Sequence, residues 1–567
     1  MKRPDSVAKR FTAAALLLCF ALSAAGQAPR VARGSGGAVA AAEENAARVG
    51  VEILKRGGNA ADAAVAVAFA LAVTWPEAGN LGGGGFWTSL DSRRRALVVD
   101  FREMAPREAR RDLYTAPRKG AGPPSSTEGP LASGVPGSVA GLALAHRRAG
   151  RLPWKTVVEP AVRLARDGFV MTAAVSESIA SDKDRLAADP EAARIFLPGG
   201  APPAPGTTFR QPELARTLEA IRDRGEDGFY RGRIARDIEL GQKRAGGLIT
   251  RGDLARYEAR IRKPVWFHFR GADVVTPPAP SSGPVLAEMA LMADLVGDLR
   301  LREPGVESAH WMAEIEKRAF HDRNRYLGDP AFPGVQQKLF LDPARAKALV
   351  ASIQPDRATR TADLPAAPGE RPTTTHFSVL DADGMAVSVT MTLNDSFGNA
   401  RVTPGLGFLW NNEMDDFATK PGQPNLYGLV QGEVNSVAPG KRMLSAMCPS
   451  IAVVGGKVAL VWGTPGGSTI PTTNLQVMLN RLLRRTSLEA AVAAPRFHQQ
   501  DLPDAIQIEK GRFDAAWISG LEKMGHEIKE RGQIGRVHAI AVEADGSITA
   551  VADPRGGGAA LVLREAP

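Results

Sequence analysis

Four short segments of the chain carry the residue types that amide cleavage requires. In chain order they read TTTHFS (373–378), NNEMDD (411–416), KRMLS (441–445) and GTPGGS (463–468). A hydroxyl at the start of a strand can act as a nucleophile, acids spaced i and i+3 can hold a cation, and two successive backbone N–H groups can face a developing oxyanion. Together these segments predict a site that cleaves amides.

Thr374 is the predicted nucleophile. A threonine hydroxyl attacks a carbonyl only when a base takes its proton, and the sequence has neither the order of a serine-protease triad nor a Gly-x-Ser-x-Gly turn. If the chain is cut before Thr374, the new α-amine, with a reference pKa of about 7.7–8.0, is that base. The stretch 360–372, rich in Pro, Ala and charge, is expected to be an exposed linker in which such a cut is accessible. With three successive threonines, a cut one residue away is the alternative.

The strand pattern after the linker predicts which side chain stands beside Thr374. Apolar and polar residues alternate on both sides of the turn 382–384, which indicates a β-hairpin. A three-residue loop with its glycine in the left-handed conformation sets Thr374 opposite Thr392, whereas a four-residue loop would set it opposite Met391, on the wrong face. We therefore predict the first register, with the Thr392 hydroxyl next to the nucleophile.

These segments, with GGNA (57–60), NLGGGG (80–85) and SSG (281–283), resemble the γ-glutamyltranspeptidase family over nearly the whole chain that follows the signal-like N-terminus. The resemblance implies the α+β, four-layer αββα sandwich of N-terminal-nucleophile hydrolases. It implies that self-cleavage produces a large chain (26–373) and a small chain (374–567), which remain associated and build the fold jointly. The implied reaction is transfer of a γ-glutamyl group from glutathione or related γ-glutamyl amides, through an ester on Thr374, to water or to an amino acid or dipeptide. No cofactor or metal is implied.

The resemblance also carries the family's site residues to positions in this chain. Around the reacting carbonyl, Thr392 would supply a second hydroxyl, and Gly466 with Gly467 would form the oxyanion hole. Tyr427, in the loop 421–432, would belong to a lid. Arg102 and Ser445 would bind the donor's α-carboxylate. Asn394, Glu413 and Asp416 would surround its α-ammonium. The planar fork of an arginine suits a bidentate contact with a carboxylate.

Two residues depart from the family pattern. Ala446 and Cys448 stand where many members carry serines, and Ala446 removes one contact near the donor carboxylate or the oxyanion.

Two alternatives to γ-glutamyl transfer remain. A β-lactam (cephalosporin) acylase of the same superfamily would act on glutaryl side chains, but a glutaryl group offers no ammonium to Glu413 and Asp416. A non-catalytic exported binding protein would keep the fold without turnover, but the nucleophile and the glycine pair are both present.

The composition of the whole chain is that of an ordinary globular protein, with 44% apolar and 23% charged residues among 567. The excess of 71 basic over 61 acidic side chains gives a net charge of +10, but no Lys/Arg block is interleaved with aromatics, so nucleic-acid binding is not predicted.

A basic start, the apolar run 11–22 and small residues up to Ala25 predict a signal peptide over residues 1–25. The mature protein would be periplasmic or secreted, without a membrane anchor, and Cys448 would have no disulfide partner within the chain.

The elements that must position these residues follow from periodicity and from helix breakers. Helices are predicted over 40–56, ended by Gly57–Gly58, over 60–73, capped by Asn59, and over 307–326 and 472–483. Besides the hairpin, strands are predicted over 97–101, 407–410, 450–454, 457–462, 539–543 and 548–552. Helices concentrated before the linker and strands after it indicate a sheet-rich core covered by helices.

Replacing the nucleophile tests the maturation hypothesis. Thr374→Ala should leave a single uncut precursor, because it removes the hydroxyl that self-cleavage requires. A denaturing gel with intact mass of the purified protein checks this, and the unaltered protein should give two chains on the same gel. A variant that still splits between Thr373 and Thr374 would show that an external protease makes the cut.

Overall fold

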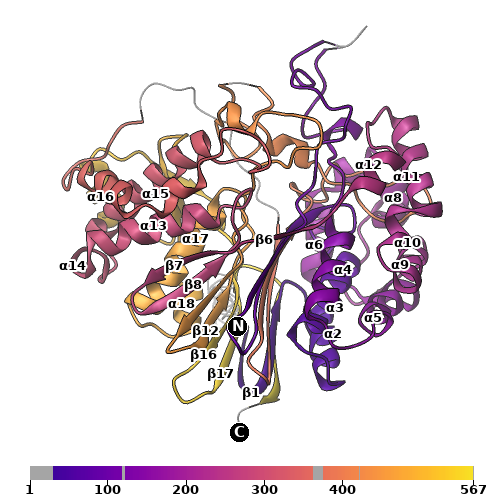
Figure 1. Ribbon diagram of the computed structural model, residues 1–567, viewed down its shortest axis with the longest axis horizontal. Helices are drawn as coiled ribbons and strands as arrows, with labels where there is room; N and C mark the ends of the chain where they lie inside the picture. Colours follow the sequence, from indigo (N-terminus) through magenta and orange to yellow (C-terminus); the bar gives the residue numbers. More distant parts are fainter. Residues whose placement is uncertain (1–29, 118–121, 362–373, 421, 566–567) are drawn as a thin grey trace, which may run out of the picture.

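The computed structural model describes residues 30–117, 122–361, 374–420 and 422–565. The predicted signal cleavage after Ala25 and most of the linker before Thr374 lie outside the described residues. A curled antiparallel sheet of 13 strands crosses the centre of the molecule, and a group of helices stands on each side of it (Figure 1).

The strands of the large sheet come from both sides of the predicted cleavage point. In spatial order they are β6 (Arg260–Arg262), β3 (Ala96–Asp100), β2 (Gly84–Leu90), β10 (Ala386–Thr392), β9 (Thr375–Asp381), β1 (Arg30–Ala41), β17 (Ile548–Ala552), β16 (His538–Val542), β12 (Lys457–Trp462), β11 (Ser450–Val454), β8 (Ala272–Thr276) and β7 (Val265–Phe269), with β18 (Ala559–Glu565) also paired to β1. Two small sheets hold β4 (Phe169–Val170) with β5 (Thr208–Phe209), and β13 (Phe497–His498), β14 (Ile506–Glu509) and β15 (Ile528–Arg531).

The helices form two groups that follow the order of the chain (Figure 1). The first group is α2 (Glu44–Lys55), α3 (Ala60–Thr74), α4 (Ser138–Ala149), α5 (Trp154–Asp167), α6 (Ala173–Ser181), α7 (Lys183–Ala187), α8 (Pro190–Phe196), α9 (Pro212–Arg224), α10 (Asp227–Tyr230), α11 (Gly232–Ala245) and α12 (Arg251–Arg256). The second is α13 (Gly283–Val296), α14 (Asp298–Leu301), α15 (Val306–Tyr326), α16 (Pro343–Ala351), α17 (Thr469–Met478), α18 (Leu488–Ala493) and α19 (Ala515–Lys523). Within the described ranges, no helix combines the length and the apolar character that crossing a membrane requires.

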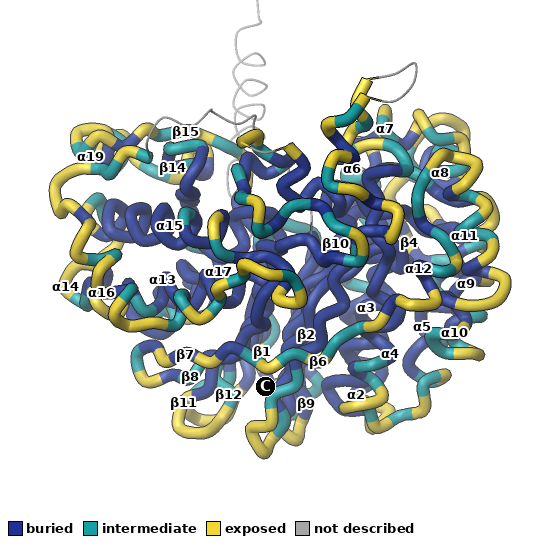
Figure 2. Tube along the Cα trace, turned by 45° about the horizontal axis from the view of Figure 1, so that its top comes forward, coloured by how far each residue is buried: buried dark blue, intermediate teal, exposed yellow. Residues whose placement is uncertain are grey.

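Three buried cores separate four layers. The first packs α2, α3 and α5 against strands such as β10, through residues such as Val387. The second packs α13, α15 and α17 against strands such as β12, through Leu460. The third consists of strand side chains alone, among them Leu380 and Ile540, so two halves of the curled sheet face each other there. Figure 2 shows buried residues along the central strands and also along helices such as α3. The predicted αββα sandwich is confirmed.

The N-terminal elements differ from the prediction at one boundary. The predicted helix over 40–56 begins only at Glu44, because Arg30–Ala41 form β1, which pairs with β9, β17 and β18. Gly36 and Gly37 have φ of +79° and +130°, and the register of β1 shifts between Ser35 and Ala38. This irregularity breaks the period-two alternation by which a strand is recognised.

The next helix agrees with its prediction. It spans Ala60–Thr74, and the Asn59 side chain accepts the N–H of Asp62 while the Asp62 carboxylate accepts the N–H of Asn59. Gly57, with φ of +84°, ends the preceding helix as predicted.

The other predicted elements agree with the structure except in two places. The strand predicted over 407–410 is wrong: in the described chain this segment makes only isolated bridges, from Trp410 to Gly82 and from Leu409 to Val402. The helix predicted over 472–483 starts earlier, at Thr469, and its last five residues, 479–483, form a π-helix.

The hairpin that carries the predicted nucleophile has the predicted register. Ser378 lies opposite Ser388 and His376 opposite Thr390, and the loop glycine, Gly384, has φ of +85°. The three-residue loop is therefore confirmed, and continuing the ladder beyond the pair Met391–Thr375 brings residue 374 level with 392.

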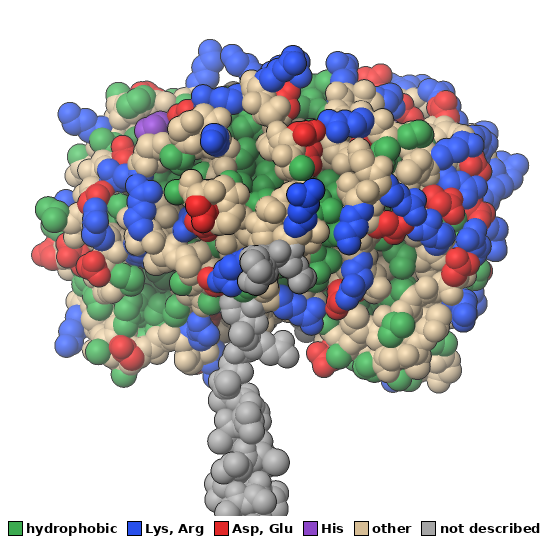
Figure 3. Space-filling view, turned by 90° about the horizontal axis from the view of Figure 1, so that it is seen from below, with side chains coloured by type: hydrophobic (Ala, Val, Ile, Leu, Met, Phe, Trp, Pro, Cys, Tyr) green, Lys and Arg blue, Asp and Glu red, His purple; other side chains and the backbone are tan. Residues whose placement is uncertain are grey.

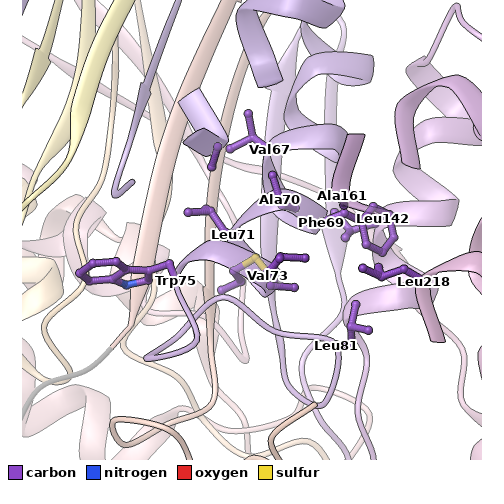
Figure 4. Packing of buried hydrophobic residues seen from close by; sticks show 14 of the residues in the cluster. Val67, Phe69, Ala70, Leu71, Val73, Trp75, Leu81, Leu142, Ala161 and Leu218 are labelled. Atoms are coloured by element: carbon purple, nitrogen blue, oxygen red, sulfur yellow. The ribbon is translucent and has the colours of Figure 1, made fainter. Parts of the chain in front are cut away.

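Deleting the same side chain at a buried and at an exposed leucine tests the packing of α3. Leu71, which has no exposed surface, lies in the cluster of Figure 4, and Leu299 is 99% exposed. Leu71→Ala should lower the free energy of unfolding by about 2–5 kcal/mol, because it removes buried methyl groups and leaves a cavity. Leu299→Ala should change it by less than about 0.5 kcal/mol. Urea unfolding of both variants checks this, and equal effects would contradict the buried position of α3.

Candidate active site

The hydroxyls of Thr374 and Thr392 lie next to each other at the open end of the hairpin. Thr374 Oγ1 donates to Thr392 Oγ1 at 3.4 Å, and Thr392 Oγ1 accepts the N–H of Asn394 at 2.8 Å. The side chain of Asn80, from the glycine-rich segment, donates to the Thr392 carbonyl at 2.9 Å. Both threonines are buried. The sheet register and these contacts hold the Thr374 hydroxyl in one direction.

The glycine pair lies between β12 and the N-terminal end of α17. Gly466 and Gly467 have φ of +144° and +55°. A Cβ on Gly467 would come within 2.4 Å of the Tyr427 ring, and one on Gly466 within 2.4 Å of the Thr469 hydroxyl. Both positions therefore require glycine. The start of a helix also carries a partial positive charge, which favours negative charge nearby.

Arg102 is completely buried and is surrounded by acceptors. Its Nη1 donates to Glu413 and its Nη2 to Asp416, and its Nε donates to the Met443 carbonyl at 3.2 Å. Burial raises the pKa of both Glu413 and Asp416, and the Arg102 guanidinium opposes this shift for both. The structure thus brings the predicted carboxylate-binding arginine and the predicted ammonium-binding acids together, but pairs them with one another.

One pocket collects most of the predicted residues. Its lining includes eight of them: Thr374, Thr392, Asn394, Glu413, Asp416, Tyr427, Ser445 and Gly467. It also includes five residues that the sequence reasoning did not assign to a role in binding or catalysis: Arg323, Leu429, Ala446, Met447 and Ile470. Arg102 bonds to Glu413 and Asp416 but does not itself line the pocket.

Arg323 is the charged pocket residue that sequence reasoning missed. It lies on α15, where Ala319 and Phe320, four and three positions earlier, are also buried. Residues at these spacings share one face of a helix. A charged residue on a buried helix face is uncommon, but α15 also buries Glu314, Glu316 and Asp322, so the helical pattern alone does not single out Arg323.

Tyr427 covers the pocket from the loop that was predicted to be a lid. Its hydroxyl donates to the carbonyl of Asn394 at 2.7 Å, and its own carbonyl accepts from Gln500 at 3.2 Å. Asn394 in turn donates through Nδ2 to the Asn412 carbonyl at 3.0 Å. The tyrosine is buried and its ring lies against Gly467, so in this structure the described part of the loop is folded down over that glycine.

The segment with the two departures from the family pattern forms the opposite wall. Ser445 Oγ accepts the N–H of Met447 at 3.2 Å, and Ala446 presents only a methyl group. Cys448 is buried behind them, Asn474 donates to its sulfur at 3.2 Å, and burial raises the pKa of its thiol to about 12. The thiol therefore stays protonated and acts as a packing group.

The histidines near the site are bound into the fold. His376 contacts the hydroxyls of Thr390 and Ser378, and His498 contacts Thr472 and Gln500. Burial lowers the pKa of both imidazoles, so both are neutral at physiological pH. Among the residues that the structure describes, no group of three or more His, Cys, Asp or Glu side chains is placed to hold a metal ion.

Comparison with known proteins agrees with this geometry. Residues 46–563 match the family described as "Gamma-glutamyltranspeptidase". The "Glutathione hydrolase proenzyme" of Escherichia coli (strain K12) is 42% identical, covering 96% of this chain and 97% of that protein, and the protein of the same name from Pseudomonas aeruginosa is 43% identical, covering 97% and 98%. Among solved structures, a cephalosporin acylase from Bacillus halodurans matches with a TM-score of 0.84 at 26% identity, covering 99% of both chains. The chain therefore belongs to the γ-glutamyltranspeptidase family of N-terminal-nucleophile hydrolases.

Proposed function

We propose that the protein is a glutathione hydrolase and γ-glutamyltransferase, which moves the γ-glutamyl group of glutathione or a related amide to water or to an amine acceptor. The observation that carries this proposal is a single pocket lined by a threonine hydroxyl, by Gly467 of the glycine pair, by two carboxylates and by an arginine. The extent of the match to two glutathione hydrolase proenzymes supports it. The name "proenzyme" agrees with maturation by self-cleavage.

Maturation would begin with the same hydroxyl that later performs catalysis. Thr374 Oγ1 attacks the carbonyl of residue 373, the C–N bond breaks, and the resulting ester is hydrolysed by water. This step yields a chain ending at 373 and a chain whose first residue, Thr374, carries a free α-amine. That amine is the base for turnover.

Turnover would then proceed through an ester on Thr374. The α-amine takes the proton of Thr374 Oγ1, and the oxygen adds to the γ-carbonyl of the donor. The developing oxyanion is met by the backbone N–H groups of Gly466 and Gly467. The amine leaves with the proton returned by the α-ammonium, and water or an acceptor amine then attacks the ester and releases the γ-glutamyl group.

Both chains would stay together after the cut, because the sheet interleaves them. In the large chain, β1 lies between β9 and β17 of the small chain, and β2 pairs with β10. Separating the chains would break backbone hydrogen bonds along several strands and expose the cores. We infer that the large chain spans 26–373 and the small chain 374–567, after removal of an export signal over residues 1–25.

A zwitterionic donor end fits the charges of the pocket. Oε2 of Glu413 is buried and has no hydrogen-bond partner among the described residues. The α-ammonium of a γ-glutamyl donor would supply that partner next to Asp416 and Asn394. Arg102 and Ser445 would hold the α-carboxylate, which requires the Arg102 guanidinium to exchange one of its two acids for the donor.

Three anilide assays separate the candidate activities. The processed protein should release aniline from γ-glutamyl anilide with a kcat/KM about ten- to a hundredfold higher than from glutaryl anilide, because the glutaryl group loses the charge-assisted ammonium contacts. A preference for glutaryl anilide would indicate the β-lactam acylase, and cleavage of neither by fully processed protein would indicate a binding protein. Adding a dipeptide acceptor distinguishes hydrolysis from transpeptidation, because the acceptor raises the rate of aniline release only if the enzyme transfers the γ-glutamyl group to it.

A conservative substitution tests the buried arginine. Arg102→Lys should raise the KM for γ-glutamyl anilide about ten- to a hundredfold although the charge is kept, because an ammonium cannot bind several carboxylate oxygens in one plane. Self-cleavage should survive, as measured by fragment masses on the same preparation. Arg111→Lys is the matched control, since Arg111 pairs bidentately with Glu433 away from the pocket. Normal donor kinetics in processed Arg102→Lys protein would exclude Arg102 from donor binding.

A further inference from the structure

Asp415 is a buried carboxylate that takes no part in the proposed turnover. On the face of the molecule in Figure 3, acidic side chains lie at the surface among Lys and Arg. Asp415 is only 3% exposed, yet unlike Glu413 and Asp416 it does not line the pocket beside Thr374. Burial raises its pKa to about 6, with smaller contributions from Asp416 and Asp395, so Asp415 is mostly ionised at neutral pH. A buried charge persists only when specific partners hold it.

The two oxygens of Asp415 join two loops that lie on either side of the proposed cut. Oδ1 accepts from Ser126 Oγ at 2.6 Å, and Oδ2 accepts from the backbone N–H of Leu426 at 2.7 Å. Ser126 lies in the proposed large chain, whereas Leu426 lies in the lid loop, directly before Tyr427. Because the acceptor is ionised, both bonds are stronger than bonds between neutral groups.

The loop that carries Ser126 is itself fixed to the rest of the protein. Asn412 Nδ2 donates to the carbonyl of Thr127 at 2.9 Å, and Asn399 Nδ2 donates to the carbonyl of Gly129 at 3.2 Å. Ser126 and Asp415 are therefore held on a fixed part of the molecule, and the lid is attached to that part at Leu426.

The lid is a wall of the pocket that can move. Its described residues, 422–432, form neither helix nor strand, and Tyr427 and Leu429 line the pocket. With the lid folded down, the cavity of this pocket measures about 10 Å³, which is room for about one water molecule. A γ-glutamyl donor can enter only when a wall moves, and a loop without regular structure is the wall that opens most easily. The bonds that hold this loop therefore matter for turnover.

We propose that Asp415 is a positioning residue that connects Leu426 to Ser126, holds the lid closed and thereby shields the ester on Thr374 from water. The shielding rests on the proposed function and deepens it, whereas the connection does not depend on that function. A closed lid excludes bulk water and gives an acceptor amine a wall against which it can be oriented. Closure of the lid therefore favours transfer over hydrolysis.

Hydrogen exchange of the lid tests the connection directly. In processed protein at neutral pH, Asp415→Ala should raise the exchange rate of a peptide covering 425–429 about ten- to a hundredfold, because the Leu426 N–H loses its charged acceptor. Asp415→Asn, which keeps the shape but loses the charge, should raise it less. Asp356→Asn is the matched control, because Asp356 is exposed, and it should leave the rate unchanged. Peptides from the hairpin 375–392 should exchange as in the unaltered protein, which shows that the loosening is local.

A second variant shows whether Ser126 acts through Asp415. Ser126→Ala alone should raise the exchange rate of 425–429 about two- to tenfold, because Asp415 loses one of its two partners. Added to Asp415→Ala, it should change the rate by less than about twofold, because both residues belong to one connection. Fragment masses confirm that each variant is processed and therefore folded. Additive effects would show that the two residues support the fold independently, and they would overturn the proposal.

The fate of the ester tests the shielding. With γ-glutamyl anilide and a dipeptide acceptor, processed Asp415→Ala should give a ratio of transfer to hydrolysis at least about threefold lower than the unaltered protein and Asp356→Asn. Unchanged exchange of the lid, an unchanged ratio, or no transfer product from the unaltered protein would overturn the proposal. If the unaltered, processed protein cleaves no γ-glutamyl anilide at all, the proposed function itself fails, and hydrogen exchange still decides whether Asp415 holds the lid.

Discussion

The pairing of β9 on both of its edges is the constraint on which the site depends. This strand begins directly after Thr374 and is bonded to β10 on one side and to β1 on the other. Its position therefore does not rely on the peptide bond that precedes it. A nucleophile at the start of such a strand keeps its place when that bond is cut, so one geometry can serve both the precursor and the mature protein.

Because other segments pack closely against this hairpin, several of the surrounding residues must be glycine. In the glycine-rich segment, a Cβ on Gly83 would come within 2.1 Å of the Thr392 carbonyl, and one on Gly85 within 2.3 Å of the Thr390 carbonyl. Gly463 lies against the His376 ring, where a Cβ would meet the ring at 2.4 Å. Close packing of three backbone segments around the hairpin leaves the Thr374 hydroxyl few directions in which to move.

Local rules predicted those parts of the site that local geometry determines. The cap at Asn59, the loop at Gly384 and the register of the hairpin follow from residue types a few positions apart. The strand β1 was missed because its glycines and bulge hide the alternation, and the segment 407–410 has a strand-like composition but no ladder partner. Whether each of these two segments pairs as a strand depends on residues far away in the chain.

The contacts among charges were beyond sequence reasoning for the same reason. Arg102 and Glu413 are 311 positions apart, and a motif that names each of them does not say that they bond to each other. Arg323 belongs to no segment with a recognisable chemical pattern, and only the fold carries it from α15 to the wall beside Ser445.

We expect the balance of these charges to favour a zwitterionic donor end. Arg102 and Arg323 contribute two positive charges, and three buried carboxyl groups, those of Glu103, Glu413 and Asp416, lie within ion-pair distance of Arg102. A zwitterionic donor end adds no net charge, so it can exchange partners with these groups without leaving an uncompensated ion in a buried site. A glutaryl group would add a negative charge alone, and it would leave the free oxygen of Glu413 without a cation. In this charge arrangement, a γ-glutamyl group is a better fit than the acyl group that differs from it only by the missing ammonium.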